Sequence, residues 1–197
     1  KFKDALEKIE IAKVLCEGLV PLYEKEYGPK HPRTLTMRIH RAFVNDHVDL
    51  GQQAIDEYRE IVALYEKRPG PPDTNLANAL RSLAYVVRKQ GNVAEARGLC
   101  ERGIRIERSS PKPNGWTLAG LQYMLMSILE LTDDMAALDH ASVELSRLAE
   151  QYALNSMLDR ATVKYWKARA DRKLGRPEDA WKQALEAESF SRERLRW

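Results

Sequence analysis

The chain has 197 residues, of which 44% are hydrophobic and 31% are charged, so it is predicted to be soluble and folded rather than disordered. Its formal net charge of +3 is too small to indicate binding to nucleic acid or to a membrane. Apolar runs stay well short of the roughly 18 residues of a transmembrane helix and no secretory signal is visible, so we expect a cytoplasmic protein. The first residue is Lys rather than Met, which suggests a piece of a longer protein.

A spacing of 42 residues recurs along the chain. The triplet Leu22-Tyr23-Glu24 returns as Leu64-Tyr65-Glu66, and Gly28-Pro29 returns as Gly70-Pro71. Two sets of positions with mostly small side chains follow the same step. One set is Ala12, Ala54, Ala96, Leu138 and Ala180. The other set, which is expected to be buried between paired helices, is Ala42, Ala84, Met126 and Ala168. A fixed period between about 20 and 50 residues indicates a solenoid of stacked units, which presents a long concave surface and usually has no enclosed active site.

The apolar spacing is helical throughout, as Leu80, Leu83 and Val87 illustrate, and no stretch alternates as a strand does. Asn92 and one Asp of the turn Thr132-Asp133-Asp134 are predicted to begin helices as N-caps. Pro21 lies within the first predicted helix, although proline typically kinks or breaks a helix. The nine helices are expected at residues 3–26, 32–48, 51–68, 73–90, 93–108, 114–131, 134–152, 156–173 and 177–196.

The first of these helices matches the second helix of each later pair, through Ala12 and Leu22-Tyr23. Its own first-helix partner is missing or reduced to residues 1–9, so Ala5, Leu6 and Ile9 should be partly uncovered, and such faces invite association. We expect a single domain over 1–197 with no internal boundary. Its approximate repeat units are 1–28 (partial), 29–70, 71–112, 113–154 and 155–197.

The two cysteines, Cys16 and Cys100, are two repeats apart. If each repeat advances the stack by roughly 10 Å, their sulfurs are about 20 Å apart. A disulfide requires Cα atoms within about 7 Å of each other. Both thiols are therefore expected to be reduced and buried.

The pattern of Leu83-Ala84, Gly91 and Ala96 resembles the tetratricopeptide repeat (TPR), and Ala168, Gly175, Ala180 and Ala187 repeat it. The TPR period is typically about 34 residues, and the longer period here resembles the kinesin-light-chain variety. The phrase at residues 27–35 resembles the Gly-Pro-acid-His-Pro-x-Thr loop of that variety. The resemblance implies an all-α, right-handed TPR solenoid of about four helix pairs plus an unpaired N-terminal helix. Arg41 and Leu138 depart from the pattern, so cargo specificity is not carried over.

The residues that would support catalysis or metal binding are scarce. His31, His40, His47 and His140 show no His-Glu-x-x-His spacing, and no Cys-x-x-Cys is present. A Gly-x-Ser-x-Gly nucleophile motif and a Gly-rich phosphate loop are also missing from the sequence. We therefore expect no enzyme activity, no metal and no cofactor.

The resemblance implies that the first helix of each pair lines a concave, peptide-binding groove. The predicted groove residues are His40, Phe43, His47, Asn78, Arg81, Tyr85, Arg88, Lys89, Tyr123, Ser127, Glu130, Tyr165, Arg169, Arg172 and Lys173. Tyr and Arg supply anchor contacts, and Arg pairs well with carboxylates, so the expected partner is a protein or peptide segment with acidic residues and an aromatic anchor.

Other interpretations of these residues stay open. The basic side chains could form an ordinary solvated face, and Trp116, Trp166 and Trp181 are expected to pack between helices. The chain could be a structural solenoid that self-associates through exposed ends, or a helical repeat that binds RNA. The favoured interpretation is a non-enzymatic adaptor or sensing arm of a multidomain protein.

Overall fold

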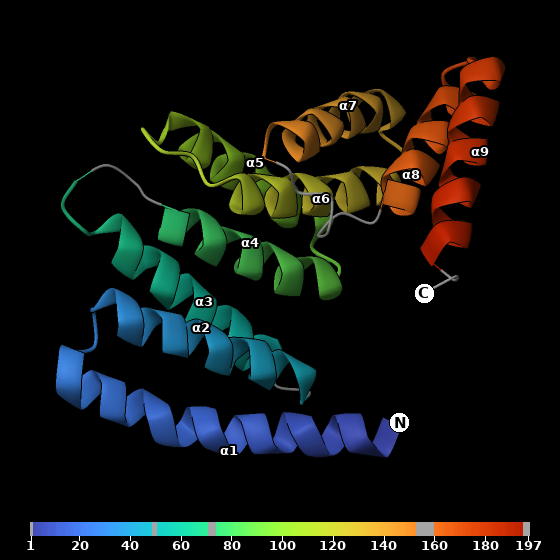
Figure 1. Cartoon of the computed structure of the whole chain (residues 1–197). Helices are drawn as coiled ribbons and strands as arrows, with labels where there is room; N and C mark the ends of the chain where they lie inside the picture. The colour runs from blue at the N-terminus through green and yellow to red at the C-terminus, as the bar shows by residue number, and fades with distance from the viewer. Residues whose placement is uncertain (1, 49–50, 71–73, 153–159, 195–197) are drawn as a thin grey trace. The chain divides into compact units, whose positions relative to one another are not determined.

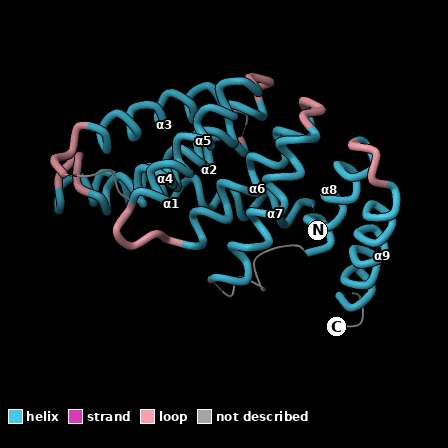
Figure 2. Tube along the Cα trace, turned by 90° about the horizontal axis from the view of Figure 1, so that it is seen from above, coloured by secondary structure: helices cyan, strands magenta, loops and turns pink. Residues whose placement is uncertain are grey.

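The computed structural model describes residues 2–48, 51–70, 74–152 and 160–194. These residues form nine α-helices and no strand, which confirms the all-α prediction (Figures 1 and 2). The helices are α1 (Phe2–Tyr27), α2 (Pro32–His47), α3 (Gly51–Glu66), α4 (Thr74–Lys89), α5 (Val93–Ser109), α6 (Gly115–Leu131), α7 (Met135–Gln151), α8 (Arg160–Lys173) and α9 (Pro177–Arg194). No helix among the described residues is long and apolar enough to cross a membrane.

The chain forms two compact units, Lys1–Pro111 and Lys112–Trp197, and each is described by itself. In the first unit, α1 to α5 pack consecutively and α2 also contacts α4. In the second unit, α6 to α9 pack consecutively. Each unit therefore stacks neighbouring helices as a helical repeat does.

Small side chains lie where paired helices approach each other. Ala42, Ala84, Ala54 and Ala96 are fully buried, as the repeat predicts, because a larger side chain would push the backbones apart. Met126 occupies the equivalent position in α6 and is also fully buried. The expectation that Ala168 is buried in the same way is wrong, since it is only half-buried and lines an open pocket between α8 and α9.

The helix ends follow local chemistry that the sequence predicts. The Asn92 side chain caps α5 by accepting a hydrogen bond from the Glu95 amide at 3.3 Å, and Asp134 caps α7 through the Ala137 amide at 3.2 Å. Gly91 ends the turn after α4 with φ +87°, a conformation that costs glycine little.

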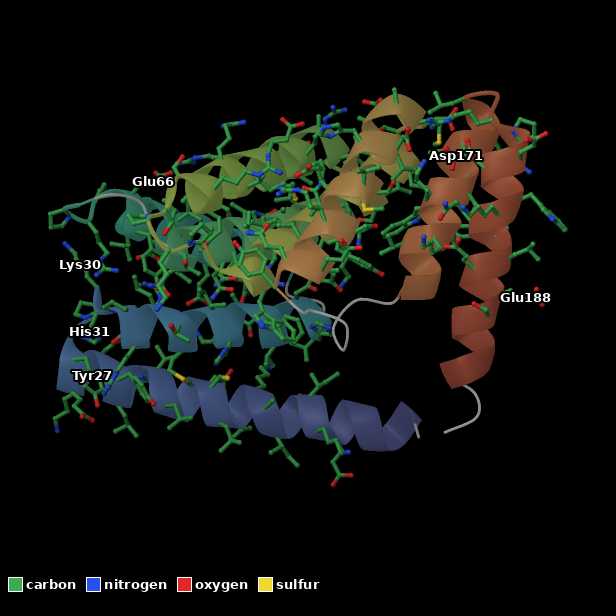
Figure 3. The ribbon with its side chains drawn as sticks, turned by 45° about the horizontal axis from the view of Figure 1, so that its top comes forward. Tyr27, Lys30, His31, Glu66, Asp171 and Glu188 are labelled. Atoms are coloured by element: carbon green, nitrogen blue, oxygen red, sulfur yellow. The ribbon has the colours of Figure 1, made fainter. Side chains whose placement is uncertain are left out.

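The loop phrase at residues 27–35 organises the start of α2 (Figure 3). His31 stacks on Tyr27 with ring centroids 5.2 Å apart, and its Nδ1 accepts a hydrogen bond from the Arg33 amide. The Thr34 hydroxyl is buried and lies 2.8 Å from the Gly28 carbonyl and 3.1 Å from the Tyr23 carbonyl. These contacts give the loop, including His31, a structural role.

Proline does not break α1, which runs through Pro21 without interruption. Proline at this position leaves the Glu17 carbonyl without its helical donor. Both residues are exposed, so water can satisfy that carbonyl and the penalty stays tolerable. The single helix predicted over residues 3–26 is therefore confirmed.

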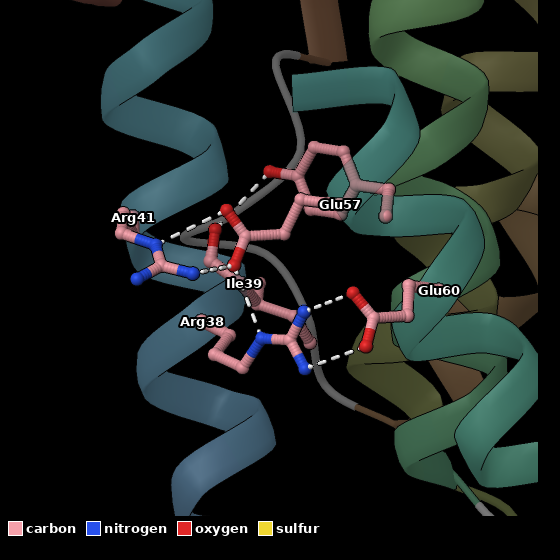
Figure 4. A network of polar contacts seen from close by, with 6 residues as sticks. Arg38, Ile39, Arg41, Glu57 and Glu60 are labelled. Carbon is pink, nitrogen blue, oxygen red and sulfur yellow. Dashed lines mark hydrogen bonds and ion pairs between the residues drawn. The ribbon is translucent and has the colours of Figure 1, made fainter. Parts of the chain in front are cut away.

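An ionic network joins α2 to α3 and accounts for Arg41, which replaces the expected apolar residue (Figure 4). Glu57 accepts from Arg38 Nε at 3.1 Å and also pairs with Arg41. Arg38 Nη2 lies 2.6 Å from Glu60 Oε2. Burial alone would lower the pKa of Arg38, but its hydrogen bonds to Glu60 and Glu57 outweigh burial and raise the pKa. The paired charges therefore replace apolar packing in this seam.

Cys16 in α1 and Cys100 in α5 are both free and buried. Their reduced, buried state agrees with the sequence prediction. Burial raises the pKa of Cys16 and raises that of Cys100 to about 12, so neither thiol ionises readily at neutral pH.

Candidate functional site

The predicted groove residues of the first unit form an outward stripe on α2 and α4. His40, Phe43 and His47 are exposed on α2, and Phe43 and His47 lie with ring centroids 4.4 Å apart. One repeat later, Tyr85 and Lys89 occupy the positions of Phe43 and His47 on α4. Because α2 contacts α4, these side chains belong to one surface of the unit. Asn78 lies on the same face of α4, half-buried.

Lys89 is not a free cation of that stripe. Its Nζ lies 3.0 Å from Asp46 Oδ2 and 3.2 Å from the Asp46 carbonyl oxygen. Asp46 is buried in α2, so the pair ties α4 to α2 and removes much of the positive charge that Lys89 would offer a ligand.

Arg81 and Arg88 are half-buried on α4 rather than turned out to solvent. The Nε atoms of both are buried without a hydrogen-bond partner among the described residues. Burial lowers the pKa of Arg81, whose neighbours include Cys100 and Tyr58. The Arg88 guanidinium lies 5.9 Å from the centre of the Tyr85 ring. Sequence spacing placed both arginines on the groove face, but the structure places them at its edge.

Two of the three predicted residues of α6, Tyr123 and Glu130, contact α8. Glu130 accepts hydrogen bonds from Trp166 Nε1 at 2.6 Å and from Arg169 Nη1 at 2.7 Å. The Tyr123 ring packs 5.0 Å from the Trp166 ring. Ser127 donates to the Met124 carbonyl within its own helix. Glu130 thus neutralises Arg169 and joins two helices of the second unit.

A pocket of about 420 Å³ opens between α8 and α9. Its aromatic walls are Tyr165, which is 54% exposed, and Trp181, which is 68% exposed. The described residues that line it are Tyr165, Ala168, Arg169, Arg172, Pro177, Ala180, Trp181 and Ala184. Three of the lining residues, Ala168, Ala180 and Ala184, have small side chains that fill little of the pocket. The pocket therefore combines apolar volume with nearby positive charge.

Arg172 is a basic lining residue of this pocket for which no ion pair is found among the described residues. Arg169 is engaged by Glu130, and Lys173 lies 3.3 Å from Asp133. Arg172 is exposed and has no acidic partner within the described parts of the chain. An anion at the pocket would therefore meet Arg172 without displacing an existing ion pair.

A second ionic cluster fixes the turn from α8 to α9 beside the pocket. Asp171 is fully buried and lies 2.8 Å from both Lys167 and Arg176, and Figure 3 labels it near the α8–α9 turn. Asp139 of α7 lies 2.6 Å from the same two cations. These contacts hold Pro177 and the start of α9 against α8, which keeps the pocket walls in place.

The pocket occupies positions that the first unit buries. Ala168 is equivalent to Ala42, and Ala184 is equivalent to Tyr58; Ala42 and Tyr58 are almost fully buried. In the first unit, α4 packs against both α2 and α3. The α8–α9 pocket is thus the counterpart of a surface that elsewhere receives a helix.

Comparison with solved structures identifies the architecture. The kinesin-light-chain-like, nearly identical TPR-like repeats of Podosopora anserina superpose with a TM-score of 0.74 and 16% identity, covering 98% of this chain and 92% of that one. This chain has a TPR-like helical-repeat fold. No protein-family model and no curated protein matches it in sequence.

Two further solved structures have a similar fold. Bacillus thuringiensis PlcR in complex with the peptide PapR7 and DNA gives a TM-score of 0.68 at 15% identity, covering 94% of this chain and 68% of that one. Aspartyl phosphate phosphatase F from Bacillus subtilis gives 0.69 at 8% identity, covering 82% and 41%. At such identities the likeness shows the fold alone.

The residues that α9 contributes to the pocket were not predicted, because the resemblance to TPR proteins places the groove on the first helix of each pair. Trp181 and Trp116 are exposed, so the prediction that they pack between helices is wrong, whereas Trp166 is buried as expected. The available signal was the last repeat itself, where large Trp181 stands beside small Ala180 and Ala184. No group of His, Cys, Asp or Glu in the described ranges could hold a metal ion.

Proposed function

We propose that this chain is a non-enzymatic, cytoplasmic interaction module that binds a peptide segment of a partner protein, as an adaptor or as the sensing arm of a larger protein. The α8–α9 pocket carries this proposal. Its volume lies within the roughly 300–1,000 Å³ of typical ligand pockets, and its two exposed aromatic rings leave apolar surface uncovered. The PlcR structure with a bound peptide provides a precedent for peptide binding on this fold.

The pocket chemistry defines the segment that would fit. Tyr165 and Trp181 can hold an aromatic or large aliphatic side chain above the small residues Ala180 and Ala184. Arg172 can pair with a carboxylate, and its planar guanidinium favours two parallel hydrogen bonds. The preferred segment therefore carries an apolar anchor with an acidic residue close to it.

The outward stripe of the first unit could extend the contact along a longer segment. Phe43 is exposed and Tyr85 is half-buried, and both present ring surface on the α2–α4 face. Lys89 is held by Asp46, so this stripe would contribute aromatic rather than ionic contacts. Arg81 and Arg88 remain candidates for its edge.

The test is fluorescence anisotropy with a labelled library of acidic peptides that each contain one Trp or Phe. Binding should weaken as salt rises, because exposed charge pairs are screened. Arg172→Glu should weaken it at least about tenfold, whereas the same charge change at exposed Lys182→Glu, outside the pocket lining, should not. Equal loss in both variants would show non-specific attraction and contradict the proposal. Stronger binding to single-stranded RNA than to any peptide would favour the RNA-binding alternative.

A further inference from the structure

Helix α1 has two apolar faces, and α2 covers only one of them. Cys16 and Val20 are buried on the covered face. On the other face lie Ile11, Val14, Leu15 and Leu22, which are 54%, 62%, 57% and 60% exposed, with Leu19 at its edge. Their three- and four-residue spacing places them on one side of the helix. A helix that is apolar on both sides is typical of a buried position, but no described residue covers this second face.

Glycine in the middle of the face indicates that the partner approaches closely. Gly18 lies within α1, where glycine costs about 1 kcal/mol relative to alanine. A Cβ added there would meet no atom within 4 Å, so the packing within the chain does not require glycine. Because glycine has no side chain, the backbone of a second helix can approach α1 closely at Gly18, as it can at small residues in helix crossings.

The charges at the two ends of this face complement those of a second copy. Glu7 and Lys25 are 18 residues apart, which is five helical turns, so they lie on the same flank of α1. Lys8 and Glu26 have the same separation on the opposite flank, and all four side chains are exposed. When two copies of α1 pair antiparallel, a flank of one helix lies against the same flank of the other helix. The two flanks run in opposite directions, so the N-terminal end of one lies beside the C-terminal end of the other. Glu7 then faces Lys25 of the second copy, and Lys8 faces Glu26.

We propose that two copies of this chain associate by antiparallel pairing of their α1 helices. In this register Leu15 of each copy lies over Gly18 of the other, and Ile11 meets Leu22, so large side chains fill the space that glycine leaves. The exposed apolar area of the two faces is on the order of 1,000 Å² in total, at the lower limit for specific interfaces. The dimer is therefore reversible and depends on protein concentration.

Sedimentation velocity of the full chain over a concentration series tests the association. The wild-type chain should shift from monomer to dimer as concentration rises. Leu15→Glu places an unpaired charge in the apolar centre and should raise the dissociation constant at least about tenfold. Val143→Glu is the matched control, because Val143 is 54% exposed on α7 and should leave the dimer unchanged. A wild-type chain that stays monomeric throughout would overturn the proposal.

A charge exchange tests the antiparallel geometry. Glu7→Lys should weaken the dimer, because it sets two positive charges opposite each other, and adding Lys25→Glu should restore it. In a parallel pair Glu7 would face Lys8 and Lys25 would face Glu26, so the double variant would stay weak and overturn the antiparallel arrangement. Association that disappears in Trp181→Ala would place the interface at the α8–α9 pocket and overturn the role of α1. Circular dichroism on each variant confirms that the helices persist.

Discussion

Replacing Glu57 with Gln tests how much the ionic network contributes to the α2–α3 seam. The Glu57 side chain is only 10% exposed and binds both Arg38 and Arg41, while the Arg38 side chain is 9% exposed. Gln keeps the shape but removes the charge, and its amide donors oppose the guanidinium donors. Removing one partner of a buried pair typically costs about 3–5 kcal/mol. Arg38 keeps Glu60 and Arg41 is 30% exposed, so we expect a smaller loss of about 2–4 kcal/mol.

Glu60→Gln is the control for this substitution, since Glu60 binds the same Arg38 but its side chain is 60% exposed. An exposed pair contributes about 1 kcal/mol or less. Urea unfolding followed by circular dichroism measures both losses, and Glu57→Gln should lower the midpoint by about 1 M more than the control does. Labelling of Cys16 and Cys100 below the midpoint reports on the first unit specifically, because both thiols lie in it.

Equal losses of stability in the two variants would show that burial does not strengthen the ion pairs of Glu57. A loss below about 0.5 kcal/mol for Glu57→Gln would show that the network is neutral relative to hydrogen bonds with an amide. In that case the charges in this seam would serve only to exclude other packing partners.

The remaining predictions concern packing, thiols and pH. Ala84→Phe should cost about 1–3 kcal/mol by overpacking a fully buried crossing, whereas Ala168→Phe at the equivalent open position should cost less and fill the pocket, as thermal unfolding would show. Both thiols should label slowly in the native state, Cys100 more slowly than Cys16; rapid labelling of both would contradict their burial. Burial alone would raise the pKa of Asp139, but hydrogen bonds from Lys167 and Arg176 hold it below its usual range. The contribution of ionised Asp139 to the stability of the fold is therefore complete above its pKa in the unfolded chain, about 3.9. This contribution is lost as the pH falls through its lower pKa in the folded chain. The melting temperature of Asp139→Asn should lie below wild type at pH 7, and the gap should close in acid.

The repeat architecture was predictable because each repeat carries its own local signals. The 42-residue step of Ala42 and Ala84, the cap at Asn92 and the glycine turn at Gly91 all act within a few residues or at a fixed interval. Such signals do not depend on distant contacts, so they survive in a single sequence.

The candidate site was harder to predict because its properties depend on what covers each residue. Trp181 is exposed because no described helix covers that face of α9, and the apolar character of tryptophan gives no indication of this. Glu130 and its partner Arg169 are 39 residues apart, so the sequence shows two charges but not their pairing. Arg81 and Arg88 lie near the boundary between the outward and packed faces of α4, where helical spacing alone does not decide exposure.

The most direct test of the central claim is isothermal titration of the best acidic-aromatic peptide into the wild-type chain, Trp181→Ala and Trp116→Ala. Both tryptophans are exposed, so neither change should unfold the protein, and only Trp181 lines the α8–α9 pocket. Trp181→Ala should weaken peptide binding at least about tenfold, whereas Trp116→Ala should leave it unchanged. Equal affinity for all three proteins would contradict peptide binding at this pocket.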